Sequence, residues 1–436
     1  MKLKGFAGMM LVAMAQVMGK PNIVFIMADD LGYRGLSCYG SKEINTPHLD
    51  RLAKEGVRCT DFHSNGAVCS PTRAALMTGR YQQRSGVEGV ITAVGHREVG
   101  MALSERTMAE AMKELGYATA LFGKWHLGYQ AKFGPVKQGF DEFEGFVSGN
   151  VDYHHHIDQN GYFDWWKQGE LKDEKGYITD LITEDALGFI ERKKEEAFFV
   201  VLHHGAPHYP LQDRETPGFR VVRNGEGKRV PQPKVNRNAV YAKMIGIMDE
   251  GVGRIVAKLD ELKLRENTFI VFCSDNGPAM VLSESGLRGR KGQLFEGGHR
   301  VPGIFNWPGK LPKGKVCATP ILTMDLMPTF LAMAGTKEAG ESTFDGIDVT
   351  GILKGAKVKR APLFWRFRRT VAVRDGDWKL LREPGKGEAK VMLFNLKSDL
   401  GEKTDLSEKE PARVKRMLAL AEGWEKEVKV AKPVSE

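Results

Sequence analysis

Four short apolar segments, each followed at once by a polar cluster, constrain the fold of this chain more than any other feature. The segments are residues 22–27, 117–122, 198–202 and 268–273. Stretches with helical periodicity separate them: Thr107 and Glu110 form a capping box at the start of one, and residues 241–259 form another. This alternation predicts an α/β fold with a central mixed, mostly parallel sheet flanked by helices.

Polar side chains that can carry chemistry follow each of these segments. They are Asp29 and Asp30, Lys124 and His126, His208, and Asp275 and Asn276. Ligands of open α/β sheets bind outside the carboxyl ends of the strands, so we expect the clusters to converge on one site. Each acidic cluster taken singly could be a solvated turn. Together they form an all-oxygen ligand set, which suits Ca²⁺ or Mg²⁺ and does not suit zinc.

The pattern changes after residue 354. Short strands are expected at residues 363–367, 370–373, 378–381 and 391–395, followed by a helix over residues 411–428. This order predicts a small C-terminal antiparallel sheet with a helix. The glycine-bounded stretch at residues 335–346 is the expected linker.

The N-terminus predicts export. Lys2 and Lys4 precede an apolar stretch at residues 6–15, which ends in a small-residue cleavage pattern. We therefore expect a signal peptide at residues 1–15 and a periplasmic or secreted protein. No later stretch approaches the ~20 apolar residues of a membrane span, so no stable membrane insertion is expected.

The formal charge of +9 favours polyanionic partners. The basic residues are spread along the chain rather than gathered in one block, so no nucleic-acid partner is expected.

Cys69 stands immediately before a predicted helix. Ser70 is the expected N-cap, Pro71 suits the first helical position, and Arg73 follows one turn later. An oxyanion bound beside Cys69 would face the positive end of this helix. A lone cysteine at such a place could equally be a small buried residue of an ordinary helix.

The segment from Cys69 to Arg80 resembles the signature of the formylglycine-dependent (type I) sulfatases, C-x-P-x-R followed by A-A-L-x-T-G-R. In that family a formylglycine-generating maturation enzyme oxidises the cysteine to formylglycine (3-oxoalanine), whose hydrated aldehyde is the nucleophile. The resemblance covers residues 21–334 and implies an alkaline-phosphatase-like fold. Residues 16–345 would then be a catalytic sulfatase domain, and residues 346–436 a C-terminal α+β subdomain.

The same resemblance assigns roles within the expected site. It implies a metal, usually Ca²⁺ with Mg²⁺ as an alternative, held by Asp29, Asp30, Asp275, Asn276 and the converted Cys69. It also implies a sulfate site formed by Arg73, Lys124, His126, His208 and Lys291. Among these we expect His208, helped by Lys291, to protonate the leaving group, and His126 to accept a proton afterwards. From the residues alone, Lys124 could be a surface charge and His126 an ordinary polar contact.

Residues 152–156 form a loop with three consecutive histidines. Neighbouring residues do not share a face, so a substrate-binding role for Asp152, Tyr153, His154 and His155 is preferred over a second metal site. Aromatic residues at 162–166 could stack on sugars or belong to the core. This region resembles the arylsulfatase A and N-acetylgalactosamine-6-sulfatase branch, which implies a sulfated carbohydrate substrate, with galactose or N-acetylgalactosamine units in a polysaccharide preferred.

Two alternatives stay open. The fold and nucleophile also serve phosphonate monoester and phosphodiester hydrolases. A noncatalytic protein that binds sulfated glycans would keep Cys69 as a thiol. The chain has five cysteines, and the pairing of the four besides Cys69 cannot be determined from the sequence.

Overall fold

The computed structural model describes residues 19–93, 95–222, 231–279, 286–336 and 344–428. The expected signal peptide at residues 1–15 lies outside the described residues, and so do residues 337–343 of the expected linker.

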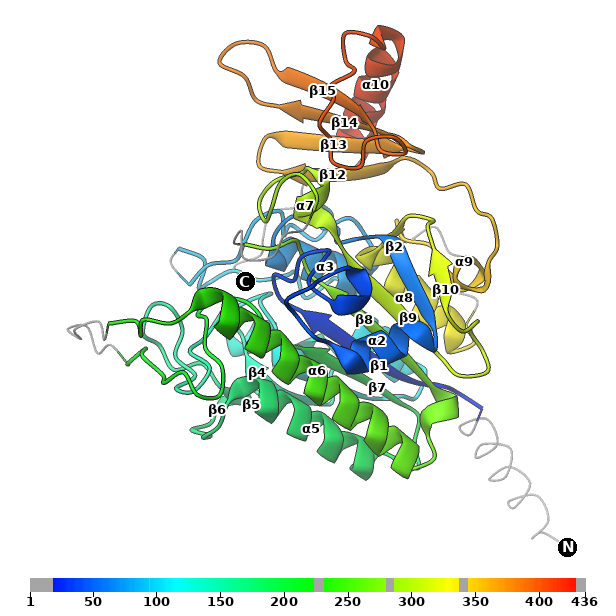
Figure 1. Cartoon of the computed structure of the whole chain (residues 1–436). Helices are drawn as coiled ribbons and strands as arrows, with labels where there is room; N and C mark the ends of the chain where they lie inside the picture. The colour runs from blue at the N-terminus through cyan, green and yellow to red at the C-terminus, as the bar shows by residue number, and fades with distance from the viewer. Residues whose placement is uncertain (1–18, 94, 223–230, 280–285, 337–343, 429–436) are drawn as a thin grey trace, which may run out of the picture.

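A large mixed sheet forms the centre of the molecule (Figure 1). Its strands are β1 (Asn22–Ala28), β2 (Val57–His63), β3 (Ala118–Lys124), β4 (Glu142–Phe146), β5 (Trp166–Lys167), β6 (Glu170–Leu171), β7 (Phe198–His203), β8 (Thr268–Ser274), β9 (Arg300–Asn306), β10 (Lys315–Cys317) and β11 (Ile321–Leu322). Their order is β10-β2-β9-β8-β1-β7-β3-β4-β5-β6, and β11 also pairs with β2.

The four strands that the sequence predicts are β1, β3, β7 and β8, and they are neighbours in the order β8-β1-β7-β3. All three pairings among them are parallel. Strand β9 runs antiparallel to both β8 and β2, which makes the sheet mixed. The prediction of a mixed, mostly parallel sheet is confirmed. Because the four strands are adjacent and parallel, their carboxyl ends meet at one edge of the sheet.

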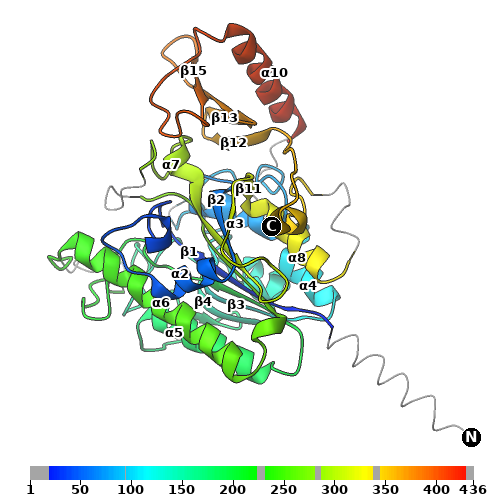
Figure 2. The ribbon, with the colours of Figure 1, turned by 45° about the vertical axis from the view of Figure 1, so that its right-hand side comes forward.

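Helices cover both faces of the sheet, so the domain has three layers (Figures 1 and 2). One face packs against α3 (Cys69–Thr78), α4 (Met108–Glu114), α8 (Leu326–Met333) and α9 (Thr350–Lys354). The other packs against α2 (Pro47–Lys54), α5 (Ile178–Arg192) and α6 (Arg237–Glu261). The remaining helices of this domain are short: α7 (Glu296–His299) and the 3₁₀ turns η1 (Ser37–Tyr39), η2 (Ala131–Phe133), η3 (Pro135–Gln138), η4 (Arg265–Asn267) and η5 (Thr323–Asp325).

A local sequence signal explains the start of α4 but not that of α3. The Thr107 hydroxyl accepts a hydrogen bond from the backbone N–H of Glu110, and the Glu110 carboxylate accepts one from the backbone N–H of Thr107, which confirms the capping box of α4. The start of α3 differs from the prediction. Its N-cap is Val68, not Ser70, and the helix begins at Cys69. The Ser70 hydroxyl instead accepts a hydrogen bond from the backbone N–H of Ile91, so it is not used for capping.

The C-terminal residues form the predicted second sheet, with strands β12 (Leu363–Phe367), β13 (Thr370–Asp375), β14 (Trp378–Glu383) and β15 (Lys390–Asn395), and the helix α10 (Pro411–Glu427). The strands are antiparallel and follow their chain order. Helix α10 covers one face through Met417 and Ala421. The sheet lies next to α7 in both views (Figures 1 and 2), and Trp365 joins a core that includes Ala75 of α3.

Within the described part of the chain, no helix is long and apolar enough to cross a lipid bilayer.

Candidate active site

The ends of β1 and β8 bring three carboxylates together. Asp29 directly follows β1, and its backbone N–H donates to the carbonyl of Ala206, 3.0 Å away, in the segment after β7. The backbone N–H of Asp275 donates to the carbonyl of Ala28 at 3.1 Å. The Asp275 carboxylate in turn accepts from the backbone N–H of Asp30 at 3.1 Å. Backbone pairing at the strand ends therefore fixes all three acids.

Cys69 lies at the centre of this group and is 1 % exposed. Its Sγ is 3.3 Å from Oδ1 of Asp29 and 3.2 Å from Nζ of Lys291. Because α3 begins at Cys69, the residue stands in the first turn, where backbone N–H groups lack intrahelical partners. Burial and the carboxylates of Asp275 and Asp29 raise the pKa of the Cys69 thiol. The unmodified side chain is therefore held as a thiol and is a poor nucleophile.

Each carboxylate is paired with one cation. Nζ of Lys124 is 2.6 Å from Asp29, Nζ of Lys291 is 2.6 Å from Asp30, and Nη2 of Arg73 is 2.8 Å from Asp275. The Lys124 and Arg73 side chains are fully buried, whereas that of Lys291 is 18 % exposed. Lys291 is therefore the cation at the open side of the site.

The carboxylates differ in their protonation. Burial and the neighbouring Asp275 carboxylate raise the pKa of Asp29 to about 7, although Lys124 opposes the shift. Burial also favours the neutral form of Asp30, but Lys291 and His208 outweigh it and lower the pKa of that carboxyl. Crowded carboxylates of this kind are relieved by a cation placed among them.

The donor atoms fit a hard divalent cation. One ligand atom from each of Asp29, Asp30, Cys69 and His208 lies within 4.8 Å of the other three. Oδ2 of Asp30 and Oδ1 of Asn276 are buried and have no hydrogen-bond partner in the described part of the chain. The amide of Asn276 donates to Asp30 at 2.7 Å, which leaves its oxygen available. Carboxylate and amide oxygens are the ligands that Ca²⁺ and Mg²⁺ prefer.

Lys124 and His126 lie on either side of Trp125, as expected. The indole of Trp125 is buried in the core, and its N–H donates to the carbonyl of Phe133 at 2.8 Å. Nε2 of His126 is 3.0 Å from the carbonyl of Ile91, so Nε2 carries the proton. Nδ1 of His126 is buried without a partner among the described residues. Burial, Lys124 and Arg73 hold the pKa of His126 well below its usual value, so Nδ1 is a free proton acceptor.

His208 approaches the site from the segment after β7. Its Nε2 is 3.5 Å from Oδ2 of Asp30, and its side chain is 14 % exposed. Burial lowers the pKa of His208 to about 3, and Lys291 and Lys124 act in the same direction while Asp30 opposes them. An anion bound beside this ring would raise the pKa again.

The loop at residues 152–155 lies beside His208. The hydroxyl of Tyr153 donates to the backbone carbonyl of His208 at 3.0 Å. Both Tyr153 and Asp152 are buried, whereas His154 is half-buried and His155 is exposed. Nε2 of His154 is 3.0 Å from the carbonyl of Asp213, and Nδ1 of His155 is 2.9 Å from that of Arg220.

The Asp152 carboxylate anchors this loop. Its Oδ1 accepts from the backbone N–H groups of His154 and His155, at 3.1 and 2.9 Å. Its Oδ2 accepts from the backbone N–H groups of Phe219 and Arg220, at 2.8 and 3.0 Å. Asp152 therefore links the loop at residues 152–155 to the segment at residues 219–220.

The nearby aromatic residues divide between core and surface. Trp165 is fully buried, and Trp166 and Phe163 pack partly against the core. Tyr162 is 54 % exposed, and the guanidinium of Arg97 lies over its ring at 3.8 Å. Of this group, Tyr162 is the exposed side chain, and Phe163 and Trp166 are half-buried.

Two contacts made by the backbone of Ile91 are not predicted from the sequence. The loop at Ile91 fixes the proton of His126 through its carbonyl and binds Ser70 through its N–H. Both contacts use backbone atoms, so no residue-type signal at Ile91 could reveal them.

This chain is similar to known proteins along most of its length. The family described as Sulfatase matches residues 21–336. The N-acetylgalactosamine-6-sulfatase of Canis lupus familiaris is 33 % identical over 385 residues, covering 82 % of this chain and 71 % of the relative. Arylsulfatase G of Rattus norvegicus is 31 % identical, covering 77 % and 69 %. The crystal structure of Ps i-CgsB in complex with k-i-k-neocarrahexaose has a TM-score of 0.83 and 32 % identity, covering 93 % of this chain and 92 % of that chain.

Proposed function

This chain belongs to the sulfatase family and is a sulfuric ester hydrolase, and we propose that it removes sulfate from galactose or N-acetylgalactosamine units of a sulfated polysaccharide. The observation that carries the proposal is the convergence of three cations and three carboxylates around Cys69. A sulfate ester needs cationic groups fixed in advance around its oxygens, and this site provides them without rearrangement.

We assign the metal to Asp29, Asp30, Asp275 and Asn276, together with residue 69. When bound, Ca²⁺ or Mg²⁺ would supply positive charge for the sulfate oxygens and for the nucleophile. We further propose that a maturation enzyme converts Cys69 to formylglycine, which would supply a hydroxyl nucleophile in its hydrated form. The position of Cys69 supports this assignment, because its side chain lies 3.3 Å from Asp29 and 3.2 Å from Lys291, among the groups assigned to the metal and the sulfate.

Lys124, Lys291 and Arg73 would hold the sulfate oxygens. They come from three separate parts of the chain, β3, the segment before α7, and α3, and each is paired with one of the three carboxylates of the site. Lys124 and Arg73 are rigidly buried, so they favour the charge that develops during transfer without a cost of reorganisation. Lys291 is partly open to solvent, so it can also meet the incoming ester.

Two histidines would act as the proton donor and the proton acceptor of the reaction. A sugar oxygen is a poor leaving group, so a proton donor is required, and His208 lies at the open side of the site with Lys291. Its low pKa without substrate means that it becomes an acid only when the sulfate anion lies beside it. His126 would act as a base through Nδ1, because its Nε2 proton is committed to Ile91.

The names of similar proteins support the sugar assignment. The relatives include N-acetylgalactosamine-6-sulfatase, and Ps i-CgsB binds k-i-k-neocarrahexaose. In this chain we propose that His154 and His155 contact the carbohydrate, with Asp152 and Tyr153 holding their loop beside His208. The predicted signal peptide supports export to the periplasm or the exterior.

A substrate panel tests the function. We expect the highest kcat/KM for sulfated galactose or N-acetylgalactosamine oligosaccharides, with lower values for 6-sulfated N-acetylglucosamine. A preference for the glucosamine ester would overturn the sugar assignment. Phosphonate monoesters and phosphodiesters belong in the same panel, because faster turnover of either would favour the alternative hydrolase.

The loss of rate in the His208→Ala variant should depend on the leaving group of the substrate. Loss of a general acid costs about 10²–10⁴-fold when the leaving group needs a proton. We expect a loss of that size on a sulfated sugar and a much smaller loss on nitrophenyl sulfate, whose phenolate leaves without help. His126→Ala should impair both substrates alike, because His126 acts after the leaving group has gone. Equal losses for His208→Ala would reject its role and leave Lys291 as the proton donor.

A further inference from the structure

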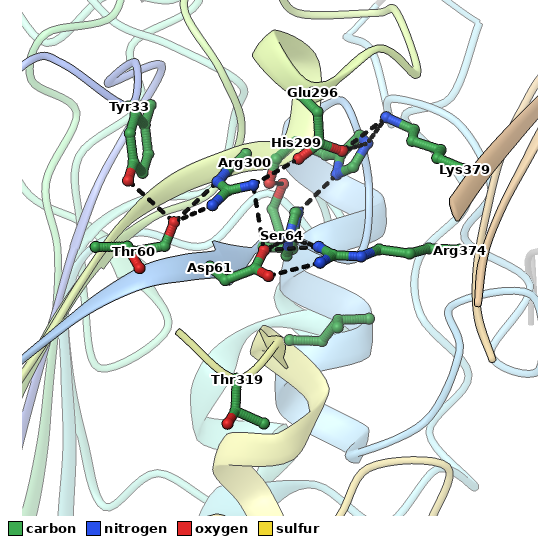
Figure 3. A network of polar contacts seen from close by, with 12 residues as sticks. Tyr33, Thr60, Asp61, Ser64, Glu296, His299, Arg300, Thr319, Arg374 and Lys379 are labelled. Carbon is green, nitrogen blue, oxygen red and sulfur yellow. Dashed lines mark hydrogen bonds and ion pairs between the residues drawn. The ribbon is translucent and has the colours of Figure 1, made fainter. Parts of the chain in front are cut away.

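A second cluster of buried charges lies between the large sheet and the C-terminal sheet (Figure 3). We call it the interface cluster. It consists of Asp61, His63, Glu296, His299, Arg300, Arg374, Lys379 and Glu402, all of which are at most 8 % exposed. The sequence analysis assigned no function to any of them.

Lys379 of β14 is the central cation of the cluster. Its Nζ is 2.8 Å from Glu296, 3.0 Å from Glu402 and 3.0 Å from Nε2 of His299. Its side chain is fully buried. Two carboxylates and an imidazole therefore share one ammonium group, and its loss would remove one of the three buried cations that balance the carboxylates of the cluster.

Arg374 of β13 forms an ion pair with Asp61 of β2. Its two terminal nitrogens both lie 2.7 Å from Asp61, one on each carboxylate oxygen. Arg300 is 3.0 Å from Glu296 and 3.4 Å from Asp61, so it joins the two acids. The cluster thus matches three carboxylates with three cations.

The two histidines have one consistent arrangement of protons. Lys379 can only donate, so Nε2 of His299 accepts and its Nδ1 carries the proton. That proton points to Nδ1 of His63, 3.0 Å away, and Nε2 of His63 then donates to Asp61 at 2.6 Å. Arg374, 3.2 Å from the same nitrogen, donates to Asp61 instead. Both rings are neutral, and both nitrogens of each ring take part in a hydrogen bond.

This arrangement argues against a metal at the interface cluster. The ligand atoms of His63, Glu296 and His299 are close enough together to hold an ion. Lys379 already binds Glu296 and His299, and Nδ1 of His63 already accepts from His299. The Lys379 ammonium group supplies the positive charge that a metal cation would otherwise supply there.

The backbone of α7 touches the active site. Its Gly298 carbonyl accepts from the N–H of Gly277, the residue after Asn276, at 2.9 Å. The N–H of Gly297 donates to the carbonyl of Arg288 at 2.7 Å. A Cβ at Gly277 would lie 1.9 Å from the Gly297 carbonyl oxygen, so this approach requires glycine. Helix α7 therefore supports the turn that carries Asn276.

The same helix supports the loop that carries Lys291. The N–H of Lys291 donates to the carbonyl of Pro278 at 3.0 Å, and the N–H of Gly292 donates to the carbonyl of Ala67 at 2.7 Å. Arg288, three residues earlier, bonds Gly297 of α7 through its carbonyl. A shift of α7 would consequently move Asn276 and Lys291 together.

Glu402 of the C-terminal subdomain fixes the start of α7. One oxygen of its carboxylate accepts from the N–H of Glu296 at 2.6 Å, and the other is 3.0 Å from Lys379. Its backbone carbonyl accepts from the Arg288 guanidinium, also at 2.6 Å. Glu402 therefore holds both α7 and the loop before Lys291.

We propose that Lys379 and Glu402 are positioning residues of the active site, which fix Asn276 and Lys291 by holding α7. The inference rests on the proposed function, which gives Asn276 to the metal and Lys291 to the sulfate. In this proposal the C-terminal sheet helps to set the geometry of the active site. The competing explanation is that the interface cluster only joins the two sheets.

Two variants and one matched control distinguish these explanations. Glu402→Gln keeps an oxygen for the N–H of Glu296 and loses the charge that meets Lys379. Lys379→Met removes the ammonium group. The control is Arg374→Met, which removes a cation from the same interface, where its partner is Asp61 of β2 and not α7. Hydrogen exchange, Ca²⁺ titration calorimetry and thermal melting are measured on each full-length protein.

For Glu402→Gln we expect amide exchange at residues 288–292 and 297–298 to rise about tenfold and Ca²⁺ affinity to fall about tenfold, as is typical when a supporting contact of a metal site is lost. Lys379→Met should show the same changes with a larger loss of Tm. Arg374→Met should lower Tm while leaving Ca²⁺ affinity and exchange in these segments unchanged.

The inference is overturned if Glu402→Gln leaves both local exchange and Ca²⁺ affinity as in the unaltered protein, or if Arg374→Met changes them equally. If Lys379→Met does not fold, the exchange and Ca²⁺ affinity of Glu402→Gln alone test the inference. Failure of the proposed function is seen separately: an unaltered protein that hydrolyses no sulfate ester refutes the function, but the exchange comparison still tests the positioning.

Discussion

Replacing Cys69 by alanine should lower the turnover of sulfate esters by about 10⁴-fold or more, the scale seen when an enzyme loses its nucleophile. The side chain is buried beside Asp29 and touches Lys291, and residue 69 is the nucleophile in the proposed function. The change removes one sulfur atom, and helix α3 should persist. Single-turnover and steady-state rates on a sulfated sugar, with a melting curve, measure the effect.

Cys59 provides the matched control. It is also fully buried, but it lies on β2, opposite Cys317 of the neighbouring strand β10, and both are free cysteines. Cys59→Ala should keep nearly full activity while losing a little stability from the small cavity. A Cys69→Ala protein with more than about a tenth of the normal rate would contradict the nucleophile assignment.

Removal of the metal should have the second largest effect. Dialysis against a chelator is expected to lower turnover by about 10³-fold, because the sulfate oxygens lose their strongest local charge. Ca²⁺ should restore the rate, and zinc should not, since the donor atoms are oxygens. Atomic absorption on the purified protein identifies the ion, and titration of the stripped protein gives its affinity.

Two aspartates paired with arginines allow a matched comparison. Asp275→Asn should weaken Ca²⁺ affinity by about tenfold or more, because a ligating carboxylate loses its charge. Asp345, which binds Arg84 at 2.8 Å outside the site, serves as the control, and Asp345→Asn should leave the affinity unchanged. Full activity after complete chelation, or recovery with zinc alone, would reject the metal assignment.

The sequence predicts the four central strands β1, β3, β7 and β8 because these strands are buried on both faces, and it does not predict the other strands of the sheet. Residues 22–27 and 268–273 are continuous apolar runs that end in polar clusters, and this pattern marks both the strand and its functional end. Parallel neighbours then bring Asp29 and Asp275 together without further information. The capping box at Thr107 is equally local and is confirmed.

The features that the sequence does not predict depend on distant partners. Ser70 has the properties of an N-cap, yet its hydroxyl meets Ile91 and the helix begins at Cys69. The members of the interface cluster come from β2, α7, β9, β13, β14 and the segment after β15, so no local pattern connects them. Buried charges such as Lys379 are indistinguishable in sequence from surface charges.

The most direct test is the mass of the tryptic peptide at residues 59–73 from active protein made in its native host. If residue 69 is formylglycine, the peptide is lighter by about 18 Da than the encoded one, because sulfur and two hydrogens leave and one oxygen enters. It should also react with a carbonyl reagent, and after alkylation it should carry a label at Cys59 alone. A fully active protein whose peptide has the encoded mass and takes up label at both Cys59 and Cys69 would contradict the account.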